Sequence, residues 1–209
     1  MVEENELADA LAGAVKGDDA DFAVLWRALN PALLRYLRVL AGDACEDVAS
    51  ETWLQASRDL GGFTGDPKGF QVWLFRIGRN RAIDEARRAG RQPVDPVAAV
   101  PEQHSGDDTA EAALTSLATR RALATIATLP RDQAEAVLLR AVAGLSAEQA
   151  GSVVGKRAGA VRIAAMRGLR SLAKRLERER EQAAADAAGT KNTQIRRLLK
   201  SGAKTGVTR

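Results

Sequence analysis

The chain has 209 residues, of which 45% are hydrophobic and only 4% are aromatic, and its formal net charge is +4. This length allows one large or two small domains, and the abundance of Ala, Leu, Arg and Glu predicts an all-α fold. The single cysteine excludes an internal disulfide, and with one distant histidine it cannot form a zinc site. We expect no metal and no cofactor. Neither a secretory signal nor an apolar run of about 20 residues is found, so we expect a cytoplasmic protein without membrane insertion.

The first 90 residues have the apolar spacing of consecutive helices. A helix is expected from residue 5 with a break at GDD (17–19), and Pro31 is predicted to start a separate helix. Residues 44–60 form the next predicted helix, and GGFTGDP (61–67) reads as a loop. The following segment, FQVWLFRIGRNRAIDEARRAGRQ (70–92), crowds six arginines among large apolar side chains and is predicted to be helical to about Gly90.

Residues 91–113 differ in character from the segments on either side. They contain three prolines and five acids with a single base, which predicts an extended acidic linker. Helices are expected again at 114–129, 131–143, 146–154 and 159–180, and the basic tail is predicted to be disordered apart from one helical turn. The predicted organisation is therefore a first domain at 1–90, a linker at 91–113, a second domain at 114–182 and a tail at 183–209.

The stretch GLSAEQAGSVVGKRAGAVRIAAMRGLRSLAKRL (144–176) predicts a helix-turn-helix. Ser146 with Gln149 three residues later forms a capping-box pattern, and Gly155 separates the first helix from a second that begins near Ala158 or Gly159. Gly151 weakens the first helix by about 1 kcal/mol relative to alanine, unless its small size serves close packing.

The second helix of this motif has two contrasting faces. At about 100° per residue, one side carries the apolar and small residues Val161, Ala165, Gly168, Leu169, Leu172 and Leu176. The opposite side carries Ile163, Arg167, Arg170 and Lys174, with Arg162 at the border. Residues 156–175 contain seven bases and no acid, which favours contact with DNA in a major groove, whereas a merely solvated basic face is the alternative.

Three segments together resemble the extracytoplasmic-function (group IV) sigma factors of bacterial RNA polymerase. CEDVASETWLQA (45–56) and WLFRIGRNRAIDEARR (73–88) are similar to signatures of sigma region two, and LPRDQAEAVLLRAVAGLSAEQAGSVVGKRAGAVR (129–162) is similar to region four. The resemblance spans roughly residues 18–180. Departures include Ser50 and Ser57 in the first signature, and Ile163 and Ala164 where the family often has Ser-Arg.

The resemblance implies an alternative sigma factor that binds core RNA polymerase through its clamp helices and flap, recognises promoter DNA and opens it for transcription initiation. A monomer is expected, and an anti-sigma factor is a further candidate partner. The polymerase-binding residues implied are Glu46, Asp47, Glu51 and Trp53. The acidic linker would follow the path of RNA through the polymerase, although a solvated tether has the same composition.

The resemblance also implies two groups of DNA-binding residues. Those for the minus-ten element and melting are Phe63, Arg76, Arg79, Asn80, Asp84, Arg87 and Arg88, with Trp73, Leu74 and Ile77 anchoring their helix. Phe63 either stacks on a flipped base or is a core residue, and Asp84 either orients Arg87 or Arg88 or forms an ordinary surface pair.

For the upstream element the candidates are Lys156, Arg157, Arg162, Ile163, Arg167, Arg170 and Lys174. Arg162 and Arg167 are suited to reading guanine, and Ile163 to meeting a thymine methyl. Lys156 and Arg157 are suited to phosphate or base-edge contact, and Arg170 and Lys174 to the backbone.

Other classes of function fit the sequence less well. No catalytic residues are expected, because no nucleophile, paired-carboxylate or phosphate-loop pattern is visible. A free-standing helix-turn-helix repressor remains open and predicts a dimer on palindromic half-sites. A polymerase-bound adaptor that regulates without opening promoters also remains open.

Overall fold

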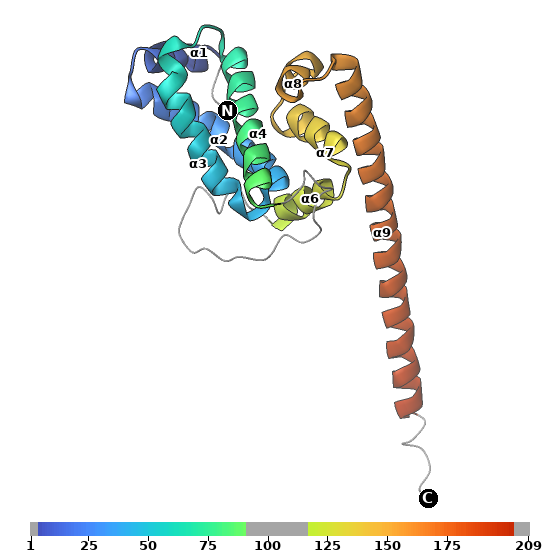
Figure 1. Cartoon of the computed structure of the whole chain (residues 1–209). Coiled ribbons are helices and arrows are strands. Elements are labelled where there is room, and N and C mark those ends of the chain that lie inside the picture. Colours follow the sequence, from blue (N-terminus) through green and yellow to red (C-terminus); the bar gives the residue numbers. More distant parts are fainter. Residues whose placement is uncertain (1–3, 91–116, 203–209) are drawn as a thin grey trace, which may run out of the picture. The chain divides into compact units, whose positions relative to one another are not determined.

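A computed structural model describes residues 4–90 and 117–202, and every regular element in those two ranges is helical (Figure 1). This confirms the all-α fold. The predicted linker at 91–113 lies outside the described residues. The N-terminal bundle consists of α1 (Glu4–Val15), α2 (Asp19–Ala41), α3 (Cys45–Asp59) and α4 (Pro67–Arg88), with short 3₁₀ turns at Gly42–Ala44 and Leu60–Gly62.

Helix α2 runs through Pro31 without interruption, so the prediction that this proline starts a separate helix is wrong. Its start is fixed by Asp18, whose side chain accepts hydrogen bonds from the backbone N–H groups of Ala20 and Asp21 at 2.8 and 3.1 Å. Proline costs an internal helix one hydrogen bond. The buried residues of α2 nevertheless repeat on one side both before and after it, at Leu25, Leu29, Leu33 and Leu37, and packing of this row offsets the loss.

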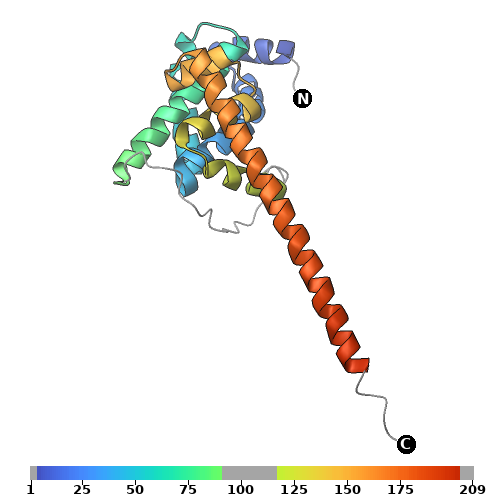
Figure 2. The ribbon, with the colours of Figure 1, turned by 90° about the vertical axis from the view of Figure 1, so that its right-hand side faces the viewer.

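The core of the N-terminal bundle lies between α2, α3 and α4, which contact one another in pairs. Figure 2 shows the helices of this bundle, coloured blue to green, from a second side. Its largest fully buried side chains are Tyr36, Phe70, Phe75, Leu25, Leu33, Leu37 and Leu74. Each large apolar side chain buried in this way contributes about 1.5–3 kcal/mol. The buried hydroxyl of Thr52 is satisfied, because it donates to the Val48 carbonyl at 2.6 Å.

All the Phe, Trp and Tyr residues of the chain lie between positions 22 and 75. Phe63, Phe70 and Trp73 form a cluster with ring centroids 5.4–5.7 Å apart. Tyr36 packs against Phe75 at 5.5 Å, and Phe22 meets Trp53 edge to face at 5.7 Å. The aromatic packing of this protein therefore belongs to the N-terminal bundle.

The C-terminal module, which we define as residues 117–169, contains α6 (Leu117–Ala127), α7 (Arg131–Val137), a π turn (Leu138–Val142), α8 (Ala147–Val154) and the start of α9 (Ala158–Gly202). These elements follow the predicted helices closely. The predicted helix at 131–143 has the expected extent, but its second half is wound as the π turn.

The predicted helix-turn-helix is formed by α8 and α9. Ser146 accepts from the Gln149 N–H at 3.1 Å, and the Gln149 side chain accepts from the Ser146 N–H at 2.7 Å, which completes the capping box. Gly155 ends α8 with a φ of 71°, a left-handed conformation that favours glycine. Gly151 is buried, and a Cβ there would collide with the Lys156 carbonyl oxygen, so its small size serves the close packing of the turn.

The chain divides into two compact units, one up to Leu169 and the other from Arg170. Helix α9 continues to Gly202, so the prediction that residues 183–202 are disordered apart from one turn is wrong. This stretch contains five alanines, two leucines and two arginines, which favour helix individually. Within 4–90 and 117–202, no helix is both long enough and apolar enough to cross a bilayer.

Candidate nucleic-acid interface

The first turns of α9 separate into a packed side and an exposed side. Val161, Ala165 and Gly168 are buried, as the predicted apolar stripe requires. Gly168 lies so close to α7 that an added Cβ would meet the Val137 side chain at 2.8 Å. Leu169 does not follow the stripe, because 52% of it is exposed.

The exposed side of α9 combines cations with apolar side chains. Arg162, Ile163 and Arg167 are all exposed, as the prediction placed them. Met166 was missed by the sequence analysis although it is 43% exposed, and Ile163 is 48% exposed. Since a helix in a major groove meets both polar base edges and the thymine methyl, this mixture suits direct readout of DNA.

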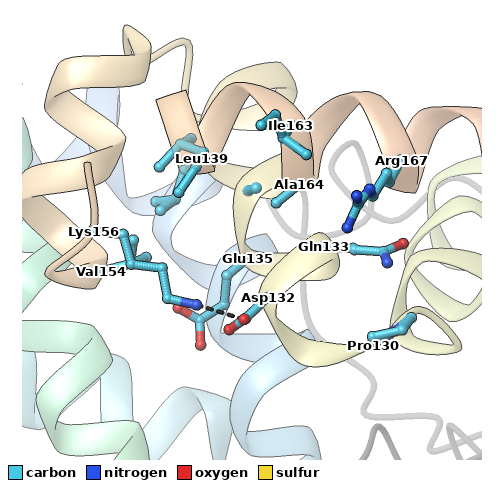
Figure 3. A pocket seen from close by; sticks show the side chains of 13 residues that line it. Pro130, Asp132, Gln133, Glu135, Leu139, Val154, Lys156, Ile163, Ala164 and Arg167 are labelled. Atoms are coloured by element: carbon cyan, nitrogen blue, oxygen red, sulfur yellow. Dashed lines mark ion pairs between the residues drawn. The ribbon is translucent and has the colours of Figure 1, made fainter. Parts of the chain in front are cut away.

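Two of the predicted DNA-binding cations are held by carboxylates of the same module. Lys156 Nζ lies 2.5 Å from Asp132 Oδ2, which comes from the start of α7 (Figure 3). Arg162 pairs with Glu148 of α8. All four side chains are more than 40% exposed, so DNA phosphates can compete for the cations.

Glu148 is more acidic than an ordinary glutamate. A hydrogen bond from its own backbone N–H lowers its pKa most, followed by the Ser146 side chain, and the Arg162 charge acts in the same direction. Its carboxylate therefore stays charged well into the acid range. Arg162 therefore keeps a charged partner at neutral pH.

A groove of about 450 Å³ lies between α7 and the exposed side of α9. Ile163 and Arg167 line it from α9, and Gln133 of α7 and Pro130 just before that helix line the other side (Figure 3). The Gln133 Oε1 is buried and accepts no hydrogen bond within the described residues. Arg167 thus lines a concave surface to which both helices contribute polar and apolar side chains.

The remaining predicted upstream cations are exposed as well. Arg157 lies in the turn just before α9. Arg170 and Lys174 belong to the second compact unit and are exposed along α9.

Helix α4 presents its predicted minus-ten residues unequally. Trp73 is half-buried and Leu74 and Ile77 are buried, in keeping with their anchoring role, while Arg76 and Asn80 are exposed. Near the end of the helix, Asp84 was predicted to pair with Arg87 or Arg88, and it pairs with Arg87. Arg87 pairs with Asp84 at 3.4 Å, and Arg88 pairs with Glu85 instead, at 3.8 Å.

Arg79, one of the predicted minus-ten residues, is held in an ion pair. Its Nε donates to Glu135 Oε2 of α7 at 2.7 Å, and the two side chains are only 21% and 4% exposed. Burial lowers the pKa of Arg79, but the hydrogen bond and charge of Glu135 outweigh it and raise the pKa overall. Glu135 also accepts from Arg131 Nε at 2.8 Å through its other oxygen.

Phe63 is half-buried, and its ring packs on Phe70 and Trp73. This packing agrees with the reading of Phe63 as a core residue at the loop edge. Part of the ring remains exposed, and the loop that carries it leads directly into α4.

The predicted polymerase-binding residues lie on α3 in two different situations. Glu46 and Glu51 are exposed and pair with Arg38 and Arg81 at 3.7 and 3.5 Å, and Asp47 is also exposed. Trp53 is 6% exposed and donates from Nε1 to Asn30 Oδ1 at 2.9 Å, so it supports the surface from below. Trp26 and Leu54, which the sequence analysis missed, are 44% and 51% exposed on α2 and α3.

Comparison with known proteins agrees with this geometry. Residues 25–92 match the family model of Sigma-70 region 2, and residues 119–172 match that of Sigma-70 region 4. The chain is 32% identical to the ECF RNA polymerase sigma factor SigD of Mycobacterium tuberculosis, covering 82% of this chain and 85% of that protein. It is 33% identical to the ECF sigma factor ShbA of Streptomyces griseus, with 76% and 89% covered.

Two solved structures are similar in fold and sequence. CnrH in complex with the cytosolic domain of CnrY gives a TM-score of 0.59 at 26% identity, with 82% of this chain and 97% of that chain covered. RpoE from Bartonella quintana, in complex with the anti-sigma factor NepR, gives 0.59 at 25% identity, with 75% and 97% covered. Two sigma-factor regions in the expected order, together with relatives that match along most of their length, show that this chain belongs to the ECF sigma factors of RNA polymerase, which direct transcription initiation.

Proposed function

We propose that the C-terminal module reads the upstream promoter element through the exposed side of α9. The observation that carries this proposal is the continuous exposed row of Arg162, Ile163, Met166 and Arg167 above the buried Val161 and Ala165. Arg162 and Arg167 contact guanine or phosphate, and Ile163 and Met166 contact thymine methyl groups. Lys156, Arg157, Arg170 and Lys174 hold the DNA backbone.

The N-terminal bundle contacts the minus-ten element through α4 and the loop before it. Arg76 and Asn80 are exposed on this helix, and Arg87 and Arg88 provide positive charge near its end. Arg79 joins them once Glu135 releases it. Phe63 contributes the exposed edge of its ring to an unpaired base, because stacking on aromatic side chains tolerates any base.

Core RNA polymerase is engaged at two places. The clamp helices dock on α3, where Glu46, Asp47 and Glu51 offer negative charge and Trp53 holds the helix in position. Exposed Leu54 and Trp26 add apolar area to this surface. The flap contacts the C-terminal module.

The protein acts as a cytoplasmic monomer and has no enzymatic activity of its own. An anti-sigma factor is a candidate partner, since one of the similar solved structures contains a protein so named. Residues 1–90 and 114–182 form the two working domains, and residues 91–113 form the acidic linker between them.

Run-off transcription tests this function. The full chain is added to core polymerase with a library of genomic promoter fragments, and transcripts with defined start points are expected only when both proteins are present. A dimer that protects palindromic sites without polymerase would support the repressor reading instead. Polymerase binding without transcripts would support the adaptor.

Arg167→Ala is the first variant to assay on a promoter identified in this way. We expect transcription to fall by roughly 5- to 150-fold, the equivalent of about 1–3 kcal/mol for a lost base contact, with reduced protection of the upstream element. Arg180→Ala, an exposed arginine further along the same helix, is the matched control and should leave transcription unchanged. Unchanged upstream protection in the Arg167 variant contradicts the assignment.

A further inference from the structure

The ion pair between Arg79 and Glu135 lies where the two halves of the sigma factor pack together, α4 against α8 and α2 against α6 and the π turn. Arg79 lies on α4 of the N-terminal bundle, and Glu135 lies on α7 of the C-terminal module, 56 residues later in the chain. A second contact lies nearby, because the Gln71 side chain of α4 donates to the Ala143 carbonyl at 2.7 Å. Both are direct polar contacts between the helix that we assign to the minus-ten element and the module that we assign to the upstream element.

Glu135 has the properties of an exchangeable partner for Arg79. Its two carboxylate oxygens are used separately, Oε2 by Arg79 and Oε1 by Arg131 of its own helix. If Arg79 leaves, Glu135 keeps a charged partner four residues away and is not left as an unpaired buried charge. The guanidinium of Arg79 can bind a DNA phosphate as well as a carboxylate.

The contact also covers part of the predicted DNA-binding side of α4. Arg79 lies one turn after Arg76 and directly before Asn80, and both of these neighbours are exposed. The guanidinium of Arg79, which lies between them, is hydrogen-bonded to Glu135. DNA and Glu135 therefore compete for one cation, and a DNA strand cannot reach Arg79 while α7 covers it.

We propose that Glu135 acts as an internal substitute for phosphate, which holds Arg79 and closes the two halves in the free protein, so that DNA must displace it. This proposal rests on the assignment of α4 to promoter DNA. The closed form is the binding-incompetent state of a two-state equilibrium, and the affinity for DNA is reduced by the fraction of molecules that are closed.

The closed state is tested by energy transfer in the full chain without polymerase. Donor and acceptor dyes are attached to Ser57→Cys on α3 and Ser152→Cys on α8, both exposed, in a Cys45→Ala background. Glu135→Gln and Arg79→Gln are each expected to lower the transfer efficiency, and the double variant should lower it no further than either one alone. Additive effects, or unchanged transfer in both single variants, overturn the proposal.

Two control variants distinguish loss of the Arg79–Glu135 ion pair from a general effect of changed charge. Arg131→Gln removes the other partner of Glu135 without touching α4 and should leave transfer unchanged. Glu6→Gln, an exposed acid on α1, makes the same change in net charge as Glu135→Gln and should also have no effect. Circular dichroism melts establish that each variant is folded.

The competition is measured with wild type, which requires no substitution at the pair. A single-stranded oligothymidylate added to the dye-labelled chain should lower the transfer efficiency as it binds. In anisotropy titrations, Glu135→Gln should bind the same strand roughly tenfold more tightly, as expected if about a tenth of the wild-type molecules are open. Binding without a change in transfer overturns the proposal.

The two proposals can fail separately. If the transfer efficiency changes as expected but run-off transcription gives no transcripts, the proposed function is wrong and the closed state of the free protein is still supported.

Discussion

Glu148 is an acid among the cations of the helix-turn-helix. It pairs with Arg162, one of the residues proposed to read DNA, and hydrogen bonds from its backbone N–H and from Ser146 lower its pKa. An acid at this position repels phosphate, and it holds Arg162 in an exposed ion pair. If Arg162 reads DNA as proposed, a base or phosphate competes with Glu148 for it.

Replacing Glu148 by glutamine should strengthen binding to random-sequence DNA. The reason is that one more cation is free to release a counterion, which makes the slope of log K against log salt steeper by roughly 1. Fluorescence anisotropy at several salt concentrations measures both quantities. Glu177→Gln, an exposed acid further along α9, is the control; an equal increase in this variant assigns the effect to net charge alone.

Tyr36 is a second residue whose surroundings make a clear prediction. Its hydroxyl is fully buried and makes no hydrogen bond of normal geometry within the described residues. Burial raises the pKa of Tyr36, and the charge of Glu135 raises it further, against the opposing effects of Arg79 and Arg131. A raised folded-state pKa stabilises the protein below the unfolded value of about 10, and that stabilisation is lost as the pH rises through the folded value.

Tyr36→Phe should therefore change stability near neutral pH by less than about 1 kcal/mol, because no hydrogen bond is lost. At alkaline pH the variant should be more stable than wild type, since it has no phenol to ionise on unfolding. Urea unfolding at pH 7 and above pH 10 measures the difference. A large loss at pH 7 indicates that the hydroxyl has a partner after all.

The sequence was informative about which side of a helix a residue occupies and much less informative about what it meets there. Arg79 was correctly placed on a helix that has a solvent-exposed face. Its partner Glu135 lies 56 residues away in the sequence, and no local pattern reveals such a contact. Met166 and Leu54 were overlooked because apolar residues were assumed to face the core. Their exposure depends on tertiary packing, which periodicity does not contain.

Among the elements, the helices were predicted well and their interruptions poorly. Pro31 was read as a helix start because proline is favoured in the first turn, yet the buried row of α2 continues across it. Residues 183–202 were read as disordered because they offer few large apolar side chains. Local helix propensity, together with continuation from a preceding helix, outweighed the lack of a core in α9.

The close approach of α8 and α9 gives a prediction at Gly151. In most exposed helix positions, glycine to alanine stabilises by about 1 kcal/mol, but here the new methyl group meets the Lys156 backbone carbonyl. Gly151→Ala should instead destabilise the C-terminal module by roughly 1–3 kcal/mol, because a backbone atom must move. Thermal unfolding followed by circular dichroism measures it. Gly159→Ala, at an open position in the first turn of α9, should not destabilise.

At the scale of the whole molecule, the order of the modules was predicted from three short segments, two in the first module and one in the second. The two family matches, at 25–92 and 119–172, fall on the N-terminal bundle and on the C-terminal module with the adjoining turn of α9. Fold class and family could be predicted because both signatures are local in sequence. The contacts between the halves could not, since α4 packs against α8, and α2 against α6 and the π turn, and these segments are far apart in the sequence.

Removal of residues 183–209 should leave binding to core polymerase unchanged, because the family match ends at residue 172. Binding to nonspecific DNA should weaken, since the removed segment carries six bases and one acid. Pull-down with core polymerase and anisotropy with random DNA measure the two effects. A loss of polymerase affinity in the truncated chain assigns the tail a role in docking.

The confinement of Phe, Trp and Tyr to positions 22–75 makes the two modules spectroscopically unequal. With excitation selective for tryptophan, intrinsic emission comes from Trp26, Trp53 and Trp73, at exposed, buried and half-buried sites. Melting of the C-terminal module would change ellipticity, whereas tryptophan emission reports on the N-terminal bundle. An unlabelled sample thus contains its own reporter for one module, and any difference between the two optical signals measures how independently the halves unfold.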